Sequence, residues 1–244
     1  MKLNNLQIKN SFDGAARTYD RYASVQEKSS EHLACLCTPS IKNPKTILDI
    51  GCGTGFTALA FQKYYPHAAY TLCDLSKNMI RAAKNKVHAS NYIICDAENY
   101  EFSGPYDLEI SNLTLQWFEN IESFLGKTLP RCKYFALSIL TEGSFSAYEY
   151  LFSKENIPIL IHRYRHRDEL LALFSKVGNV IASDFRRYDL FFENALEAAK
   201  HFKYIGANVI ATQQNRAKIV AKLLSSRSKM NLNYNVLFVL LERK

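Results

Sequence analysis

The sequence lacks a long apolar run. Its longest uninterrupted stretch, from Val236 to Leu241, is far shorter than the roughly 20 apolar residues that a helix needs to cross a bilayer. The first ten residues, MKLNNLQIKN, also lack the apolar core of a secretory signal peptide. We therefore expect a soluble, cytoplasmic protein that does not enter the membrane.

Paired cysteines are missing too. The six cysteines do not show the CxxC spacing that is typical of zinc and redox sites. His162 and His166 have no acidic or cysteine companions at a metal-ligand spacing. Scattered thiols of this kind fit a reducing compartment. We expect reduced thiols and no metal site.

Acidic residues are outnumbered by basic ones. The 31 Lys and Arg residues against 23 Asp and Glu residues give a formal net charge of +8. Such a field favours acidic partners, either nucleic acid or an acidic protein. No recognisable RNA-binding motif accompanies the charge, so nucleic acid is the less favoured partner. The basic segment 163–167 and the cluster of Arg216, Lys218 and Lys222 are either docking sites or solvated faces.

Internal repeats and low-complexity tracts are absent as well, and 244 residues suit one domain with one sizeable core. Short apolar runs alternate with segments of helical period, which is typical of βα units. The sequence predicts a single doubly wound α/β domain over residues 1–244, with a mostly parallel sheet. Its seven strands are expected at Thr46–Ile50, Tyr70–Asp74, Tyr92–Cys95, Leu108–Ser111, Tyr134–Leu140, Val180–Tyr188 and Val236–Leu241.

Two helical segments lie outside this alternation. Residues 1–40 form a helical region that is closed by Pro39 and Pro44, because the residue before a proline is pushed out of helical geometry. Residues 193–226 form a helical insertion before the last strand, with a partly apolar face. We expect these two segments to act as lids over a site at the edge of the sheet.

The strongest local signal is ILDIGCGTGF at residues 47–56, a strand followed by a Gly-x-Gly-x-Gly turn and a helix. Glycines permit positive φ and let a ligand approach the backbone, and the helix start presents unpaired N–H groups. Asp49, two residues before Gly51, is placed to hold an ammonium group. The string therefore predicts a receptor for a zwitterionic amino-acid moiety, although an ordinary tight turn can also use three glycines.

Polar residues follow the other expected strands. Asp74 ends the second strand, where a carboxylate can accept both hydroxyls of a ribose. It could instead cap the next helix, although Ser76 is already a candidate cap. Asp96, after the third strand, could meet an adenine amino group or be a solvated acid. The candidate cofactor-binding residues are Asp49, Gly51, Cys52, Gly53, Gly55, Asp74, Leu75, Asp96, Ala97, Asn112 and Leu113.

The string LDIGCGTGF, with Asp74, Asp96 and Asn112, resembles the class I methyltransferase superfamily over residues 40–140. Three further stretches resemble the malonyl-[acyl-carrier protein] O-methyltransferases of biotin synthesis: FDGAARTYDRYASVQ at residues 12–26, SNLTLQW at residues 111–117 and FKYIGA at residues 202–207. Residues 209–233 have no counterpart in that resemblance. It implies a Rossmann-like sheet with an antiparallel last strand, and S-adenosyl-L-methionine as the cofactor.

The resemblance also implies a reaction, methyl transfer to the free carboxylate of a malonyl thioester. Malonyl-acyl carrier protein or malonyl-CoA is the implied acceptor, and the protein is expected to be a monomer. Because a malonyl carboxylate is ionised near neutral pH, positioning should matter more than acid–base catalysis. Tyr19, Gln26 and Arg187 are the candidate catalytic residues that position the substrate. Arg186 and Lys200 are alternatives to Arg187, and all three basic residues could equally be surface charges.

Other functions use the same residues. A class I methyltransferase that acts on another small acid, a quinone or RNA would share this fold and loop. A cofactor-binding protein without catalysis is a second alternative. A nicotinamide-dependent dehydrogenase is disfavoured because its fingerprint needs glycine at position 56, where this sequence has Phe56.

Overall fold

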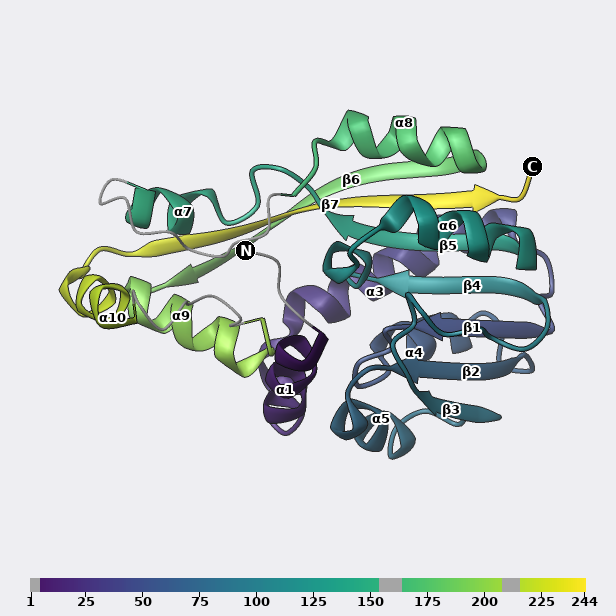
Figure 1. The fold of residues 1–244 in the computed structure, drawn as a ribbon, viewed down its shortest axis with the longest axis horizontal. Coiled ribbons are helices and arrows are strands. Elements are labelled where there is room, and N and C mark those ends of the chain that lie inside the picture. The colour runs from purple at the N-terminus through teal and green to yellow at the C-terminus, as the bar shows by residue number, and fades with distance from the viewer. Residues whose placement is uncertain (1–4, 154–163, 208–215) are drawn as a thin grey trace.

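The fold is a seven-stranded sheet with helices packed on both faces (Figure 1). The computed structural model describes residues 5–153, 164–207 and 216–244. The strand order is β3-β2-β1-β4-β5-β7-β6. The strands are β1 (Thr46–Ile50), β2 (Ala69–Asp74), β3 (Asn91–Ile94), β4 (Tyr106–Asn112), β5 (Cys132–Leu140), β6 (Asn179–Phe192) and β7 (Met230–Glu242).

Pairing within the sheet is parallel from β3 through β5, whereas β7 runs antiparallel to both β5 and β6. This arrangement confirms the predicted doubly wound sheet with its antiparallel last strand. The hairpin of β6 and β7 is longer than predicted, because residues 189–192 continue to pair with residues 230–233. Asn231 and Asn233 interrupt the apolar pattern there, which hid the extension from the sequence analysis.

The helices lie where the two expected helical segments and the βα alternation predicted them. Among the residues that the structure describes, three α-helices precede β1, and two stand between β6 and β7. The helices are α1 (Asn5–Ala15), α2 (Tyr19–Tyr22), α3 (Ser24–Cys37), α4 (Phe56–Gln62), α5 (Lys77–Lys84), α6 (Ile121–Thr128), α7 (Ser146–Ser153), α8 (Arg167–Val177), α9 (Ala195–Tyr204) and α10 (Arg216–Ser225), with short 3₁₀ turns η1 (Thr38–Ser40), η2 (Leu115–Trp117) and η3 (Leu129–Arg131).

The core consists of two apolar layers, one on each face of the sheet. Successive residues of β7 alternate between them: Val236, Phe238 and Leu240 pack into one layer, and Leu237, Val239 and Leu241 into the other. Because both faces are covered, the run VLFVLL is apolar throughout, as expected for a central strand. Each such large side chain contributes about 1.5–3 kcal/mol when it is fully buried.

The six cysteines are all free. Among residues 5–153, 164–207 and 216–244, no group of His, Cys, Asp and Glu side chains could hold a metal ion. Within the same residues, no helix is long and apolar enough to cross a membrane.

One charged side chain is buried in the middle of the sheet. Glu109 of β4 stands beside Leu48 of β1 and Phe135 of β5 in the strand register, and it is fully buried. Neither of its carboxylate oxygens has a hydrogen-bond partner. Burial raises the pKa of Glu109 to about 8 and outweighs the opposing effect of Arg131. The folded protein therefore holds this carboxyl in its neutral form at neutral pH.

This burial predicts a pH dependence of stability. The unfolded chain releases the Glu109 proton above its ordinary pKa of 4.5, whereas the folded chain keeps it up to about pH 8. Stability should therefore fall as the pH rises between these values, by up to about 1.4 kcal/mol per pH unit from this group. Thermal unfolding of wild type and Glu109→Gln from pH 5 to 8 measures it. We expect a shallower decline in the variant; parallel curves would contradict the assignment.

Candidate active site

The glycine-rich turn between β1 and α4 adopts a backbone that requires its glycines. Gly51, Gly53 and Gly55 have φ values of 66°, 54° and 98°. A Cβ on Gly51 would lie 2.2 Å from Cγ2 of Thr114, and one on Gly55 would lie 2.4 Å from Cγ2 of Val87. A Cβ on Gly53 would meet only the Tyr19 ring, at 4.0 Å. The outer two glycines are thus required by packing, and Gly53 opens toward a cavity.

That cavity measures about 100 Å³ and lies at the carboxyl ends of the strands. Its lining joins the glycine turn after β1 to residues that end or follow β2, β3 and β4, which is where doubly wound sheets bind ligands. It is lined by Asn5, Ile8, Phe12, Tyr19, Gly51, Gly53, Asp74, Leu75, Cys95, Asp96, Ala97, Glu98, Asn112, Leu113, Thr114, Trp117 and Phe118. We call this space the donor cavity.

Asp74 connects the donor cavity to the glycine turn. Its Oδ2 accepts a hydrogen bond from the Gly53 amide at 2.9 Å, and its Oδ1 accepts one from the Ser76 amide at 2.8 Å. Burial raises the pKa of Asp74 to about 6, against the lowering effect of these two hydrogen bonds. Ser76 itself caps α5 through a hydrogen bond from the Met79 amide. Each Asp74 oxygen keeps a further lone pair for a ligand hydroxyl.

Asp96 and Asn112 lie on the same wall but already have protein partners. Asp96 Oδ2 accepts from Asn5 Nδ2 at 2.7 Å and from Asn99 Nδ2 at 2.8 Å. Asn112 Nδ2 donates to the carbonyl oxygen of Gln26 at 3.1 Å. The first contact brings α1 over the donor cavity, and the second fixes the start of α3.

Three of the predicted cofactor-binding residues, Asp49, Cys52 and Gly55, do not line the cavity. Asp49 is fully buried, its Oδ2 accepts from the Ala58 amide at 3.1 Å, and its Oδ1 has no partner. Burial raises the pKa of Asp49 to about 8. Cys52 is buried, and Gly55 packs against Val87. The contact of Asp49 with an ammonium group stays a prediction, which its unpartnered oxygen supports.

The N-terminal helices close over the donor cavity through polar contacts. Asp13 of α1 accepts hydrogen bonds from the Ser76 hydroxyl and from the Asn78 amide at the start of α5. Asp20 of α2 accepts from the Thr54 hydroxyl and forms an ion pair with Lys86 at 2.7 Å. These contacts place Tyr19, the residue before Asp20, against the glycine turn.

The N-terminal helices also contact the insertion between β6 and β7. The Thr18 hydroxyl donates to the carbonyl oxygen of Tyr204 at 2.9 Å, and the rings of Tyr22 and Tyr204 stack with centroids 4.4 Å apart. Gly206, at a φ of 74°, lies so close to Phe12 that a Cβ would come within 2.7 Å of its ring. The two segments predicted as lids are therefore in direct contact.

A second cavity, of about 60 Å³, adjoins the first. Phe12, Tyr19, Leu113 and Trp117 line both cavities. The other residues of the second cavity are Gln26, Gln116, Leu140, Phe145, Tyr164, Phe202, Ile205, Ala207 and Tyr234, so its described lining carries no charged side chain. We call this space the acceptor cavity.

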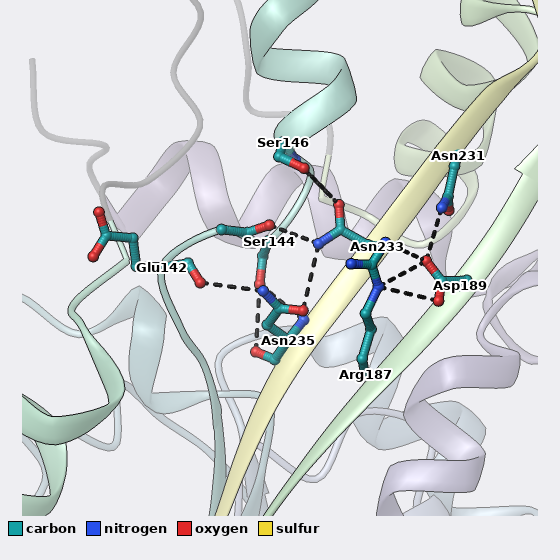
Figure 2. A network of polar contacts seen from close by, with 9 residues as sticks. Glu142, Ser144, Ser146, Arg187, Asp189, Asn231, Asn233 and Asn235 are labelled. Atoms are coloured by element: carbon teal, nitrogen blue, oxygen red, sulfur yellow. Dashed lines mark hydrogen bonds and ion pairs between the residues drawn. The ribbon is translucent and has the colours of Figure 1, made fainter.

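Phe145 is held in the acceptor cavity by an unusual backbone. Its φ is 59°, which a bulky residue rarely adopts. Its amide donates to the carbonyl oxygen of Asn233 at 2.8 Å. The Asn233 side chain donates to Gly143 at 2.6 Å and accepts from Ser146, and Asn235 donates to Glu142 (Figure 2). β7 thus fixes the loop that presents Phe145.

Of the predicted positioning residues, the structure brings Tyr19 and Gln26 together at the acceptor cavity. Burial and the neighbouring Asp74 raise the pKa of Tyr19, so its phenol stays protonated. The Gln26 Oε1 is buried without a partner. The two residues are neutral groups that can orient a ligand.

Arg187 is not brought to this site. Its guanidinium is about half exposed on β6 and pairs with both carboxylate oxygens of Asp189, which also accepts from Asn231 (Figure 2). Arg187 lines neither cavity. Residues two apart on a strand share a face, so the Asp189 carboxylate is the natural partner of Arg187. Lys200, an alternative to Arg187, is an exposed residue that pairs with Glu197.

Several lining residues were missed by the sequence analysis. Asn5 lies in no motif, and Thr114 lies within the SNLTLQW stretch but was not assigned to the site. Phe145, Tyr164 and Tyr234 reach the acceptor cavity only through tertiary packing. Phe145 forms edge-to-face contacts with Tyr164 and Tyr234. The sequence offers no signal that identifies these three aromatic residues individually.

Comparison with known proteins agrees with this geometry. A family model described as a methyltransferase domain matches residues 47–132, which carry the glycine turn and the ends of β2, β3 and β4. A malonyl-[acyl-carrier protein] O-methyltransferase of Ilyobacter polytropus is 28% identical over 97% of this chain and 94% of its own length. Residues 47–132 thus carry a methyltransferase domain, and the fold is that of the class I methyltransferases.

Other relatives have the same name. The malonyl-[acyl-carrier protein] O-methyltransferase of Neorickettsia risticii is 25% identical over 99% of this chain and 98% of its own length. That of Priestia megaterium is 34% identical over 71% of this chain and 61% of its own length.

Solved structures share the class I methyltransferase fold. A methyltransferase from Bacillus halodurans aligns with a TM-score of 0.60 and 15% identity, over 86% of this chain and 97% of that one. A complex of the Haloferax volcanii Trm112 activator and a methyltransferase aligns with a TM-score of 0.62 and 15% identity, over 97% of this chain and 98% of that one. At this identity the likeness establishes the fold.

The tight fit of Gly51 against Thr114 predicts that Gly51→Ala weakens binding of S-adenosylmethionine at least about tenfold, because the new Cβ must displace the turn. Isothermal titration calorimetry measures the affinity. Gly126→Ala, in open space on α6, is the matched control and should bind normally. Equal affinities in the two variants, with intact folds by thermal unfolding, would show that the turn does not form the donor site.

The Asp20–Lys86 contact predicts a kinetic effect. Asp20→Asn should speed cofactor dissociation about two- to fivefold, because partly exposed ion pairs of this kind contribute modestly. Stopped-flow fluorescence of Trp117, the single tryptophan, reports the dissociation from the cavity that it lines. Glu31→Gln, which removes the exposed Glu31–Lys63 pair at 2.9 Å, is the control. An unchanged rate in Asp20→Asn would mean that α2 does not retain the ligand.

Proposed function

We propose that this chain transfers the methyl group of S-adenosylmethionine to the free carboxylate of a malonyl thioester, with malonyl-acyl carrier protein as the acceptor. The observation that carries the proposal is the pair of adjoining cavities with a shared wall at Phe12, Tyr19, Leu113 and Trp117. A donor in one and an acceptor in the other would meet at that wall. The activity for which the relatives are named suggests the identity of the acceptor.

The donor cavity fits the cofactor group by group. Asp74 would take the ribose hydroxyls, Asp96 would take the adenine amino group, and the open space at Gly53 would admit the amino-acid end close to the backbone. Asp49, with its unpartnered Oδ1, would face the ammonium group from behind the turn, and the bound ammonium charge would favour the ionised form of this buried carboxyl. When bound, S-adenosylmethionine supplies a methyl group made electrophilic by a sulfonium.

The acceptor cavity suits a carboxylate nucleophile. A bidentate arginine pair would lower the nucleophilicity of the carboxylate, and the described lining offers amide and phenol groups in place of a cation. Gln26 and Tyr19 are the side chains that we assign to positioning. No general base is needed, because the acceptor is already ionised near neutral pH.

Enclosure is the second requirement of the reaction. Methyl transfer needs the reacting atoms within about 3–3.5 Å and needs water kept away from the nucleophile. The α1 and α2 helices cover one cavity, and Phe202 and Ile205 from the insertion wall off the other. The chain's contribution to catalysis is therefore to orient and to dehydrate the carboxylate.

The partner side of the proposal rests on charge. An acyl carrier protein is acidic, and the net charge of +8 would steer its approach. Residues 216–229 carry no acidic residue and five basic ones, Arg216, Lys218, Lys222, Arg227 and Lys229. Arg163, part of the other basic segment, lies outside the described residues. Transfer to the carrier protein should weaken with salt, because screening shortens the range of such steering.

A methyl-transfer assay tests the proposal. Radiolabelled methyl should move from S-adenosylmethionine to malonyl-acyl carrier protein as a base-labile ester, because the malonyl group offers a free carboxylate. Acetyl-acyl carrier protein, which lacks that carboxylate, is the control acceptor and should remain unlabelled. The gene should also restore growth to a strain that requires biotin for want of this step. No label at saturating cofactor, or label in RNA instead, would refute the proposal.

A further inference from the structure

The side-chain amide of Gln116, in η2, has a hydrogen-bond partner for its nitrogen but none for its oxygen. Its Nε2 donates to the carbonyl oxygen of Leu113 at 2.6 Å. Because the nitrogen is used in this way, the group that Gln116 offers to a ligand is the carbonyl oxygen. That Oε1 is buried and has no hydrogen-bond partner. Buried acceptors are nearly always paired in native proteins, so an unpaired one in a cavity wall calls for a donor from a ligand.

Gln116 also stands between two spaces. Beyond the acceptor cavity lies a third cavity of about 160 Å³. Gln116, Leu140 and Tyr164 line both. The third cavity is lined further by Phe118, Glu119, Ile121, Ile139, Arg165 and Leu170, and Arg165 is exposed at the surface. The three cavities therefore form a series that runs from the donor site, past Gln116, to an exposed basic residue.

The proposed methyl acceptor, a malonyl thioester, carries a hydrogen-bond donor that could reach Gln116. Its carboxylate must face the donor cavity. Its thioester must therefore point toward Gln116, which lies between the acceptor cavity and the third cavity. Both acyl carrier protein and coenzyme A present their thioesters on the same arm, in which an amide N–H follows a short distance beyond the sulfur. A malonyl carboxylate, when ionised, has no hydrogen to donate, so the amide of the arm is the group that Gln116 Oε1 can accept from.

We infer that Gln116 is a specificity-determining residue that accepts a hydrogen bond from the amide N–H of the thioester arm. The inference rests on the proposed function. It makes the enzyme select thioesters by their arm as well as by their carboxylate, since a site built around a hydrogen bond rejects analogues that lack the donor.

Two small acceptors separate this role from a structural one. Malonyl-N-acetylcysteamine carries the amide N–H, and malonyl-butanethiol is a thioester of similar length without it. We expect wild type to favour the first at least about tenfold in kcat/KM, and Gln116→Met to lose most of that preference. Gln62→Met is the matched control: Gln62 Nε2 also donates to a backbone carbonyl, that of His88 at 2.8 Å, but Gln62 lines none of the three cavities.

The outcomes distinguish a failure of the Gln116 inference from a failure of the proposed function. Equal kcat/KM of wild type on the two acceptors would overturn the inference without any variant, and so would a Gln116→Met protein that loses activity on both acceptors in equal proportion. If wild type methylates neither acceptor nor any malonyl thioester, the proposed function fails and the inference falls with it.

The source of the arm is tested separately. Malonyl-CoA and malonyl-acyl carrier protein share the amide, so Gln116→Met should lower kcat/KM on both by a similar factor. A loss confined to the carrier protein would place the contact on the protein surface and contradict a contact with the arm.

Discussion

The parallel pairing of β1 with β2 and β4 is the constraint on which the site depends. It brings three strand ends to one edge of the sheet, so the glycine turn, Asp74 and Asn112 meet although they are far apart in sequence. Short contacts then set the spacing: Asp74 accepts from the Gly53 amide, and Thr114 packs against Gly51. A ligand that binds there touches residues whose positions are determined by the backbone of the sheet.

The acceptor side is built differently, from elements that are added to the parallel sheet. β7 supplies Tyr234 and holds the loop of Phe145, and the insertion supplies Phe202 and Ile205. His201, whose pKa burial lowers to about 4, contacts the Tyr234 hydroxyl at 2.8 Å and so links α9 to β7 as a neutral group. The donor cavity thus belongs to the parallel sheet and its glycine turn, whereas the acceptor cavity is shaped by β7, the loop that it holds and the insertion.

Sequence reasoning recovered what local patterns encode. The seven strands follow from apolar runs, and the turn follows from glycines whose positive φ values the structure contains. It did not recover Phe145, because the residue type does not predict a left-handed backbone. That backbone depends on hydrogen bonds between this loop and Asn233. It named Arg187 as a residue that positions the substrate, but the pairing with Asp189 follows from the alternation of side chains along the strand.

The contact of Thr18 and Tyr22 with Tyr204 has a consequence for turnover. The helices above the donor and the insertion beside the acceptor share these contacts, so neither can swing outward without disturbing the other. Release of the spent cofactor and release of the methyl ester therefore depend on the same movement of the N-terminal helices and the insertion. A single conformational event would then set the pace at which both products leave.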